Sequence, residues 1–198
     1  MVANYRANMA VSLAMLQVTD RARAQLARLP GDGSGDGTAA ERVVAASLLR
    51  DAAAAKRALT VALRGLPDDA NGRAASGTLK ALAQYAGGDA GGALATLGTV
   101  RYHSREADRV ALHGLCALET RRFDDAVRDF EWLRDHGRRD LSPFPGVARY
   151  ALAQTFEAAG RTSEARTAYA DLLTFWRTAD RDLPFVTGAT KALARLGS

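Results

Sequence analysis

Apolar residues along most of this chain follow helical spacing, and the runs of β-branched residues that would favour strands are missing. Long stretches rich in Ala, Leu and Arg favour helices, because these residues have a low free-energy cost of entering one. Glycine, proline and acidic residues interrupt the stretches at short intervals. The pattern therefore predicts an all-α protein of many short helices.

Five segments repeat one motif, in which an alanine is followed four positions later by a large apolar residue. The alanines are Ala22, Ala55, Ala93, Ala126 and Ala165, and their partners are Leu26, Leu59, Leu97, Phe130 and Tyr169. A spacing of four places both residues on one helix face, where the alanine admits a neighbouring helix and the large residue fills the groove. The alanines lie 33, 38, 33 and 39 residues apart. These spacings bracket the 34-residue tetratricopeptide period.

The repeats predict a single right-handed superhelix of tetratricopeptide-like helical hairpins over residues 1–198. The five hairpins are expected at residues 1–29, 38–66, 70–98, 105–136 and 145–177, with a capping helix at residues 183–196. A flexible loop is expected at residues 30–37, where the sequence reads PGDGSGDG.

Individual residues refine these hairpins. Asp20 is expected to cap the second helix of the first hairpin, since carboxylates accept hydrogen bonds from the free amides of a helix start. Gly114 is expected where two helices cross closely. Gly160 is expected to supply the left-handed residue that ends a helix.

The last third of the chain carries the most specific family likeness. The run from Tyr169 to Trp176 (YADLLTFW), the following ADRDLPFV and the closing helix resemble the C-terminal tetratricopeptide region of bacterial receptor-type Ser/Thr protein kinases and related regulators. The likeness extends more loosely through most of the chain. It implies a non-catalytic module for protein interaction or sensing.

The net charge of +5 at first suggests an anionic partner. Only three of the 27 basic residues are lysine, and the arginines are spread along the whole chain. A nucleic-acid footprint should instead cluster on one face or one helix. Nucleic-acid binding through scattered arginines therefore remains an alternative to protein binding, and a homo-oligomeric scaffold is another.

Candidate chemistry is sparse. Cys116 lies in a helical pattern between apolar residues, which favours a buried thiol over a nucleophile. His103, His113 and His136 do not share the spacing of a metal site. The run from His136 to Leu141 (HGRRDL) echoes a kinase catalytic loop, but the other kinase motifs do not occur in the sequence. We therefore expect no enzyme activity, no cofactor and no metal site.

One stretch resembles a calcium site. Asp32, Ser34 and Asp36 alternate with glycine, like the opening of an EF-hand loop. Val43 stands where the bidentate glutamate should be, which favours a plain linker.

We expect a protein or peptide partner on the concave face, which the first helices of the hairpins line. The candidate binding residues are Asn4, Asn8, Tyr85, Glu119, Tyr150, Gln154 and Glu157. Several of these could instead pack against neighbouring helices. Trp132 and Trp176, on second helices, suggest possible self-association. The uncharged run near the start is too short to span a membrane, so a cytoplasmic location is expected.

Overall fold

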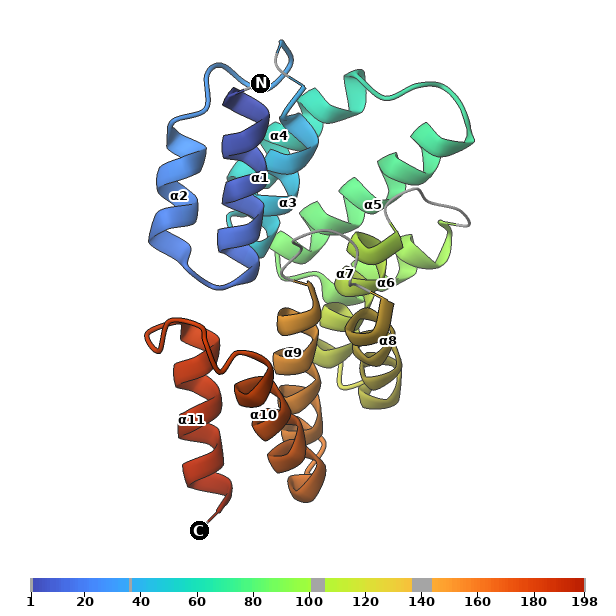
Figure 1. Cartoon of the computed structure of the whole chain (residues 1–198). Helices are drawn as coiled ribbons and strands as arrows, with labels where there is room; N and C mark the ends of the chain where they lie inside the picture. Colours follow the sequence, from blue (N-terminus) through green and yellow to red (C-terminus); the bar gives the residue numbers. More distant parts are fainter. Residues whose placement is uncertain (1, 36, 101–105, 137–143, 198) are drawn as a thin grey trace. The chain divides into compact units, whose positions relative to one another are not determined.

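The computed structural model of the whole chain describes residues 2–35, 37–100, 106–136 and 144–197. Within these ranges the chain forms eleven helices and no strands, which confirms the predicted all-α class (Figure 1). The helices are α1 (Val2–Met15), α2 (Thr19–Ala27), α3 (Ala39–Leu48), α4 (Ala52–Arg64), α5 (Ala70–Ala86), α6 (Ala90–Gly98), α7 (Glu106–Glu119), α8 (Phe123–His136), α9 (Phe144–Ala158), α10 (Thr162–Phe175) and α11 (Pro184–Leu196).

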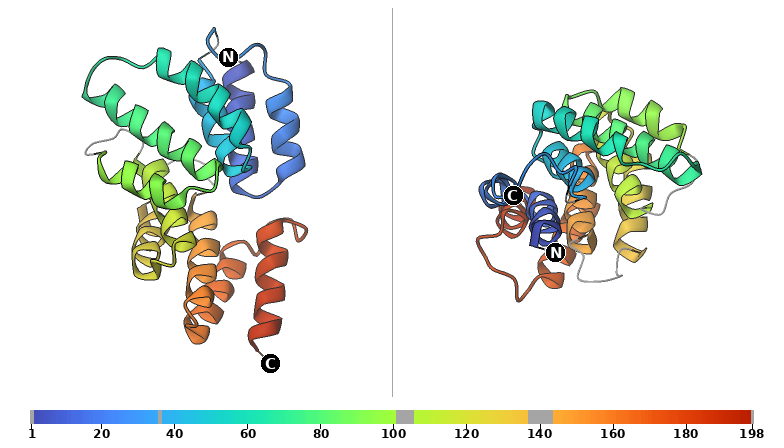
Figure 2. Two further views of the ribbon diagram at one scale, coloured as in Figure 1. Left: turned by 180° about the vertical axis from the view of Figure 1, so that it is seen from behind. Right: turned by 90° about the horizontal axis from the view of Figure 1, so that it is seen from above.

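The chain divides into two compact units, Met1–Arg109 and Val110–Ser198, and the boundary falls within α7. In the first unit α1 packs against α2, α3 against α4, and α5 against α6. The helix α3 also contacts α1 and α5. Figure 1 and the left view of Figure 2 both show α1 and α2 side by side. In the second unit α9 packs against both α8 and α10, and α10 packs against α11.

The alanines of the repeated motif lie at the centre of this packing. All five are fully buried, with 0% of their surface exposed, which confirms that these positions admit a neighbouring helix. Their large partners Leu97, Phe130 and Tyr169 are also buried. Leu26 and Leu59, in the two less regular N-terminal segments, are only half-buried. The grooves beside α2 and α4 are therefore filled less completely than those beside α6, α8 and α10.

Three helices of the first unit begin at an aspartate cap. Asp51, Asp69 and Asp89 each accept a hydrogen bond from the backbone amide three residues further on, at 2.8–2.9 Å. The prediction that Asp20 caps α2 is wrong. Helix α2 begins at Thr19 after Val18, so Asp20 lies inside the first turn. Its carboxylate there complements the helix dipole without capping it.

Two glycines have the roles that the sequence predicted. A Cβ at Gly114 on α7 would lie 2.8 Å from the ring of Phe130 on α8, so the close approach of these helices requires glycine. Gly160 follows α9 with φ of 75°, in the left-handed region that glycine tolerates best.

Candidate partner-binding sites

Two of the predicted binding residues are exposed on α1. Asn4 and Asn8 lie one turn apart and both are solvent-accessible. Tyr5 beside them is 66% exposed and Val2 is 65% exposed, although neither was predicted as a binding residue. The signal for both was available in the sequence, because the alanine stripe that α1 buries (Ala7, Ala10, Ala14) leaves them on other faces.

Tyr85 lies in the core of the first unit. Its side chain is buried, with 6% of its surface exposed. The guanidinium of Arg50 stacks over the ring at 3.6 Å from the centroid and also donates a hydrogen bond to the Tyr85 carbonyl. Arg50 itself has a positive φ of 57° in the turn between α3 and α4. Tyr85 therefore fixes this turn onto α5 and offers little surface to a partner.

Tyr150 on α9 belongs to an aromatic cluster in the second unit. Its ring stacks on Phe185 of α11, with centroids 4.4 Å apart, and meets the edge of Tyr169 of α10 at 6.1 Å. A Cβ at Gly188 would lie 2.5 Å from the Tyr150 hydroxyl oxygen. Burial raises the pKa of the Tyr150 phenol. These contacts join α9, α10 and α11.

Glu157 lies two turns from Tyr150 on α9 and accepts two interactions. Arg195 of α11 pairs with one carboxylate oxygen at 2.5 Å, and the Tyr169 hydroxyl donates to the other at 2.9 Å. The hydrogen bond from Arg195, with that from Tyr169, lowers the pKa of Glu157. Burial, followed by the bond to Glu157, raises the pKa of Tyr169. Gln154 between them on α9 is half-buried, and Glu119 is exposed at the end of α7.

The two tryptophans of the self-association prediction are half-buried. Trp132 stacks on His136 at 4.8 Å between ring centroids. Trp176 stacks on Phe185 at 5.9 Å, and a Cβ at Gly146 would lie 2.1 Å from the Trp176 ring. Self-association stays a prediction, but much of Trp176 is already used to pack α9 and α11.

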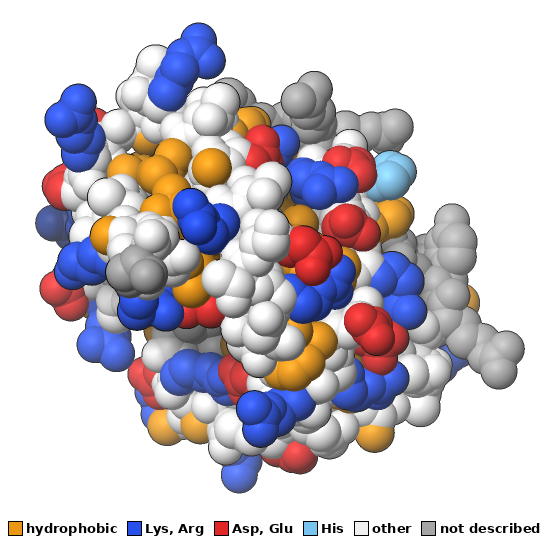
Figure 3. All heavy atoms as spheres, turned by 90° about the horizontal axis from the view of Figure 1, so that it is seen from below, with side chains coloured by type: hydrophobic (Ala, Val, Ile, Leu, Met, Phe, Trp, Pro, Cys, Tyr) orange, Lys and Arg blue, Asp and Glu red, His pale blue; other side chains and the backbone are white. Residues whose placement is uncertain are grey.

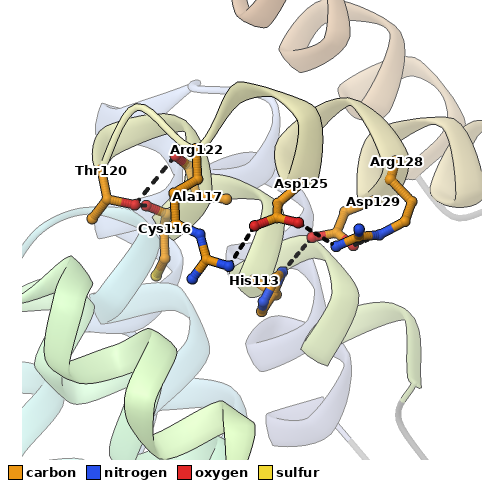
Figure 4. A network of polar contacts seen from close by, with 8 residues as sticks. All are labelled: His113, Cys116, Ala117, Thr120, Arg122, Asp125, Arg128 and Asp129. Atoms are coloured by element: carbon orange, nitrogen blue, oxygen red, sulfur yellow. Dashed lines mark hydrogen bonds and ion pairs between the residues drawn. The ribbon is translucent and has the colours of Figure 1, made fainter.

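A polar network joins α7 to α8 (Figure 4). Nδ1 of His113 pairs with the carboxylate of Asp129. Asp125 pairs with Arg122 at 2.5 Å and Arg128 at 2.7 Å, and the bond from Arg128 is the largest cause of its lowered pKa. The pair of His113 with Asp129 spans α7 and α8, whereas the pairs of Asp125 lie within α8 and the turn before it.

The candidate catalytic and metal-binding residues of the sequence do not come together in one site among the described residues. Cys116 is fully buried, as predicted. His103 and residues 137–141 of the kinase-like motif lie outside the described residues, as does Asp36 of the calcium-like loop. Asp32 accepts a hydrogen bond from the Ser34 amide at 3.0 Å, and that bond is the largest cause of its lowered pKa. No group of three His, Cys, Asp or Glu side chains in the described part of the chain could hold a metal ion.

A pocket of about 590 Å³ lies in the first unit between α2, α3, α4 and the described residues of the loop 30–37, which we call the glycine loop. We call this pocket the α2–α4 pocket. None of the seven predicted binding residues lines it. Helix α2 contributes Arg23, Leu26 and Ala27, the loop contributes Gly31 and Asp32, and α3 and α4 with the turn between them contribute Arg42, Ala46, Leu49, Asp51, Ala54, Arg57 and Ala58. The predicted peptide groove was placed on first helices, whereas Arg23 and Arg57 of this pocket lie on second helices. The half-buried Leu26 lies at its wall.

The glycine loop is held against α3. Arg42 donates hydrogen bonds to the carbonyls of Pro30 at 2.7 Å and Gly31 at 3.1 Å, and to the Thr38 hydroxyl at 2.9 Å. Gly33 is buried with φ of 95°, and a Cβ there would lie 2.9 Å from the Ala39 nitrogen. These contacts give the pocket a fixed wall on the loop side.

The charges of the α2–α4 pocket are unbalanced. Arg23 and Arg57 are both exposed, and neither forms an ion pair with any described residue. The lining also includes two aspartates that accept hydrogen bonds from backbone amides, since Asp51 caps α4 and Asp32 accepts from Ser34. The pocket thus combines an apolar wall with two guanidiniums that form no ion pair with the described residues.

A second pocket, of about 390 Å³, lies between α8, α9 and α10 of the second unit. Like the α2–α4 pocket, it lies between the second helices of two successive helix pairs (α8 and α10) and over the first helix of the later pair (α9). Its arginines, however, are paired: Arg149 with Asp171 at 2.8 Å and Arg134 with Asp135 at 2.9 Å. We call it the α8–α10 pocket.

No described helix has the length and apolar character that crossing a bilayer requires. On the face shown in Figure 3, Lys and Arg side chains are interspersed with Asp and Glu side chains. Comparison of the chain with protein-family models, curated proteins and solved structures found no match.

Proposed function

We propose that this chain is a non-catalytic, tetratricopeptide-like helical repeat that binds a protein or peptide partner. The observation that carries the proposal is the repeated motif, because the same alanine is fully buried in five successive helix pairs. Helix pairs of this kind form an extended concave surface for a partner when they stack into a superhelix. The likeness of the last third to the tetratricopeptide regions of bacterial kinases supports the same reading.

The proposed superhelix is right-handed, with first helices lining its concave face. Among the seven predicted residues, Asn4, Asn8 and Glu119 are exposed on first helices. Tyr5 adds an exposed aromatic ring beside the two asparagines. A rigid ring flanked by amides suits recognition of an extended peptide, whose backbone needs hydrogen-bond partners.

The proposal is tested by identifying a partner and reconstituting the complex from purified components. The concave variant is Asn4→Arg/Asn8→Arg, and the control is Ala24→Arg/Ala53→Arg, at exposed positions on second helices. Both variants add two arginines. We expect calorimetry to show at least tenfold weaker binding for the concave variant and unchanged binding for the control.

Two results would overturn the proposal. One is that no purified protein or peptide binds the chain. The other is that only nucleic acid binds, with an affinity that falls steeply as the salt concentration rises, because such binding releases counterions from phosphates.

A further inference from the structure

We propose that the α2–α4 pocket binds an acidic peptide segment that also carries apolar side chains. This inference rests on the proposed function, since it names the chemistry of the partner. It gives that partner a second contact, on the second helices α2 and α4, in addition to the contact proposed at Asn4 and Asn8.

Charge is the first argument. Arg23 on α2 and Arg57 on α4 come from two different helices and line one pocket, and neither pairs with a carboxylate of the described residues. Arg42 at the same wall donates hydrogen bonds to the Pro30 and Gly31 carbonyls and to the Thr38 hydroxyl, so it holds the loop side of the pocket. Guanidinium groups bind carboxylates through charge-assisted hydrogen bonds, so the pocket favours an anionic ligand.

The apolar wall is the second argument. In the three later hairpins the large residue of the motif is buried by its neighbours, but Leu26 is half-buried and lines the pocket. Leu49, Ala54 and Ala58 line it as well. A partner that covers these side chains gains about 25 cal/mol for each Å² of apolar surface removed from water. A small inorganic anion covers almost none of it.

Size and rigidity are the third argument. A volume of about 590 Å³ lies within the range of ligand sites and accommodates several side chains. The wall on the loop side is held by Arg42 and by the close packing of Gly33 against Ala39. A wall that is already ordered costs little further conformational entropy on binding.

The second unit provides an internal comparison. The α8–α10 pocket occupies the corresponding place between two hairpins, but Asp171 and Asp135 neutralise its arginines. Of these two inter-helix grooves, the α2–α4 pocket is the one with arginines, Arg23 and Arg57, that form no ion pair with any described residue. This contrast favours the α2–α4 pocket over the α8–α10 pocket as the place of the acidic segment.

The experiment measures fluorescence polarisation of the full chain against an array of ten-residue peptides. Each peptide carries three Asp or Glu and two large apolar residues at varied spacing, and matched arrays replace either the acids by Lys or the apolar residues by Ser. The test variant is Arg23→Glu/Arg57→Glu. The control, Arg21→Glu/Lys56→Glu, makes the same charge change at exposed residues of the same two helices outside the pocket. Circular dichroism checks that both variants are folded.

We expect binding of acidic, apolar peptides to wild type and control, and at least tenfold weaker binding to the test variant. Peptides of the Lys array and the Ser array should bind at least tenfold more weakly than their parents. A leucine variant, Leu26→Ser, should weaken peptide binding while leaving both arginines in place.

Other outcomes overturn the inference. These are no binding in the acidic array, equal binding to the test variant, equal binding of the Ser array, or complete displacement by millimolar phosphate or by a single-stranded oligonucleotide. If a purified partner still binds the test variant at full affinity but not the Asn4→Arg/Asn8→Arg variant, only this inference fails. If no protein or peptide binds at all, the proposed function fails with it.

Discussion

Tyr85 illustrates at the scale of one residue why a binding residue and a core residue look alike in a sequence. Its ring is buried under Arg50, whereas Tyr5 is exposed on α1. We predict that Tyr85→Ala lowers the free energy of unfolding by about 3–5 kcal/mol, as other large-to-small changes at buried aromatic residues do. Tyr5→Ala should change it by less than about 0.5 kcal/mol. Urea denaturation followed by circular dichroism measures both, and similar values for the two would contradict the placement of Tyr85.

Gly114 tests the close crossing of α7 and α8. In the variant Gly114→Ala, the added Cβ would lie 2.8 Å from the buried ring of Phe130. We predict that Gly114→Ala destabilises the second unit by about 1–3 kcal/mol, the usual cost of overpacking. Gly91→Ala is the matched change on α6, where no atom lies within 4 Å of the added Cβ. It should stabilise by about 0.5–1 kcal/mol, and a loss of stability there would count against this account.

Glu157 makes the stability of the second unit depend on pH. Its pKa lies below the ordinary 4.5 because Arg195 and then Tyr169 hydrogen-bond the carboxylate. A carboxylate with a lowered folded pKa stabilises the fold above its unfolded pKa, and that stability is lost as pH falls through the folded pKa. We predict that wild type is more stable than Glu157→Gln at pH 7 and that the difference shrinks below about pH 4.5. Urea denaturation at pH 7 and pH 3 measures it, and a difference that grows on acidification would refute it.

At the scale of elements, the glycine loop has a better-defined conformation than its composition suggests. Gly33 is buried at positive φ against Ala39, whereas Gly35 has open space around its Cβ direction. We predict that Gly33→Ala lowers the free energy of unfolding by about 1–3 kcal/mol through backbone strain. Gly35→Ala should be nearly neutral. Thermal denaturation compares the two, and equal melting temperatures would show that the loop has no fixed wall.

The helices were largely predictable because their signals are local. The repeated alanine marks a close helix contact wherever it occurs, and Gly114 and Gly160 mark a crossing and a helix end. The site was less predictable. Whether Leu26 is covered depends on how far α2 stands from α3 and α4, and no residue near Leu26 encodes that distance. The same limit explains Tyr85, whose burial depends on Arg50 reaching it from another hairpin.

At the scale of the whole molecule, the division into two units has a spectroscopic consequence. Both tryptophans, Trp132 and Trp176, lie in the second unit, Val110–Ser198. Tryptophan fluorescence therefore reports on that unit alone, while far-ultraviolet circular dichroism reports on the helices of both. Transitions that coincide for the two probes indicate two-state unfolding, and transitions that differ indicate separate steps.

We predict that the two units respond separately to destabilisation. Tyr85→Ala, in the first unit, should lower the urea midpoint of part of the circular dichroism change and leave the fluorescence midpoint within error. Gly114→Ala, in the second unit, should lower the fluorescence midpoint. Helical repeats couple mainly through nearest-neighbour interfaces, so a change in one compact unit need not unfold the other. If Tyr85→Ala shifts both probes equally, the eleven helices unfold as one cooperative body, and a partner bound at the α2–α4 pocket would then stabilise α11 as much as α2.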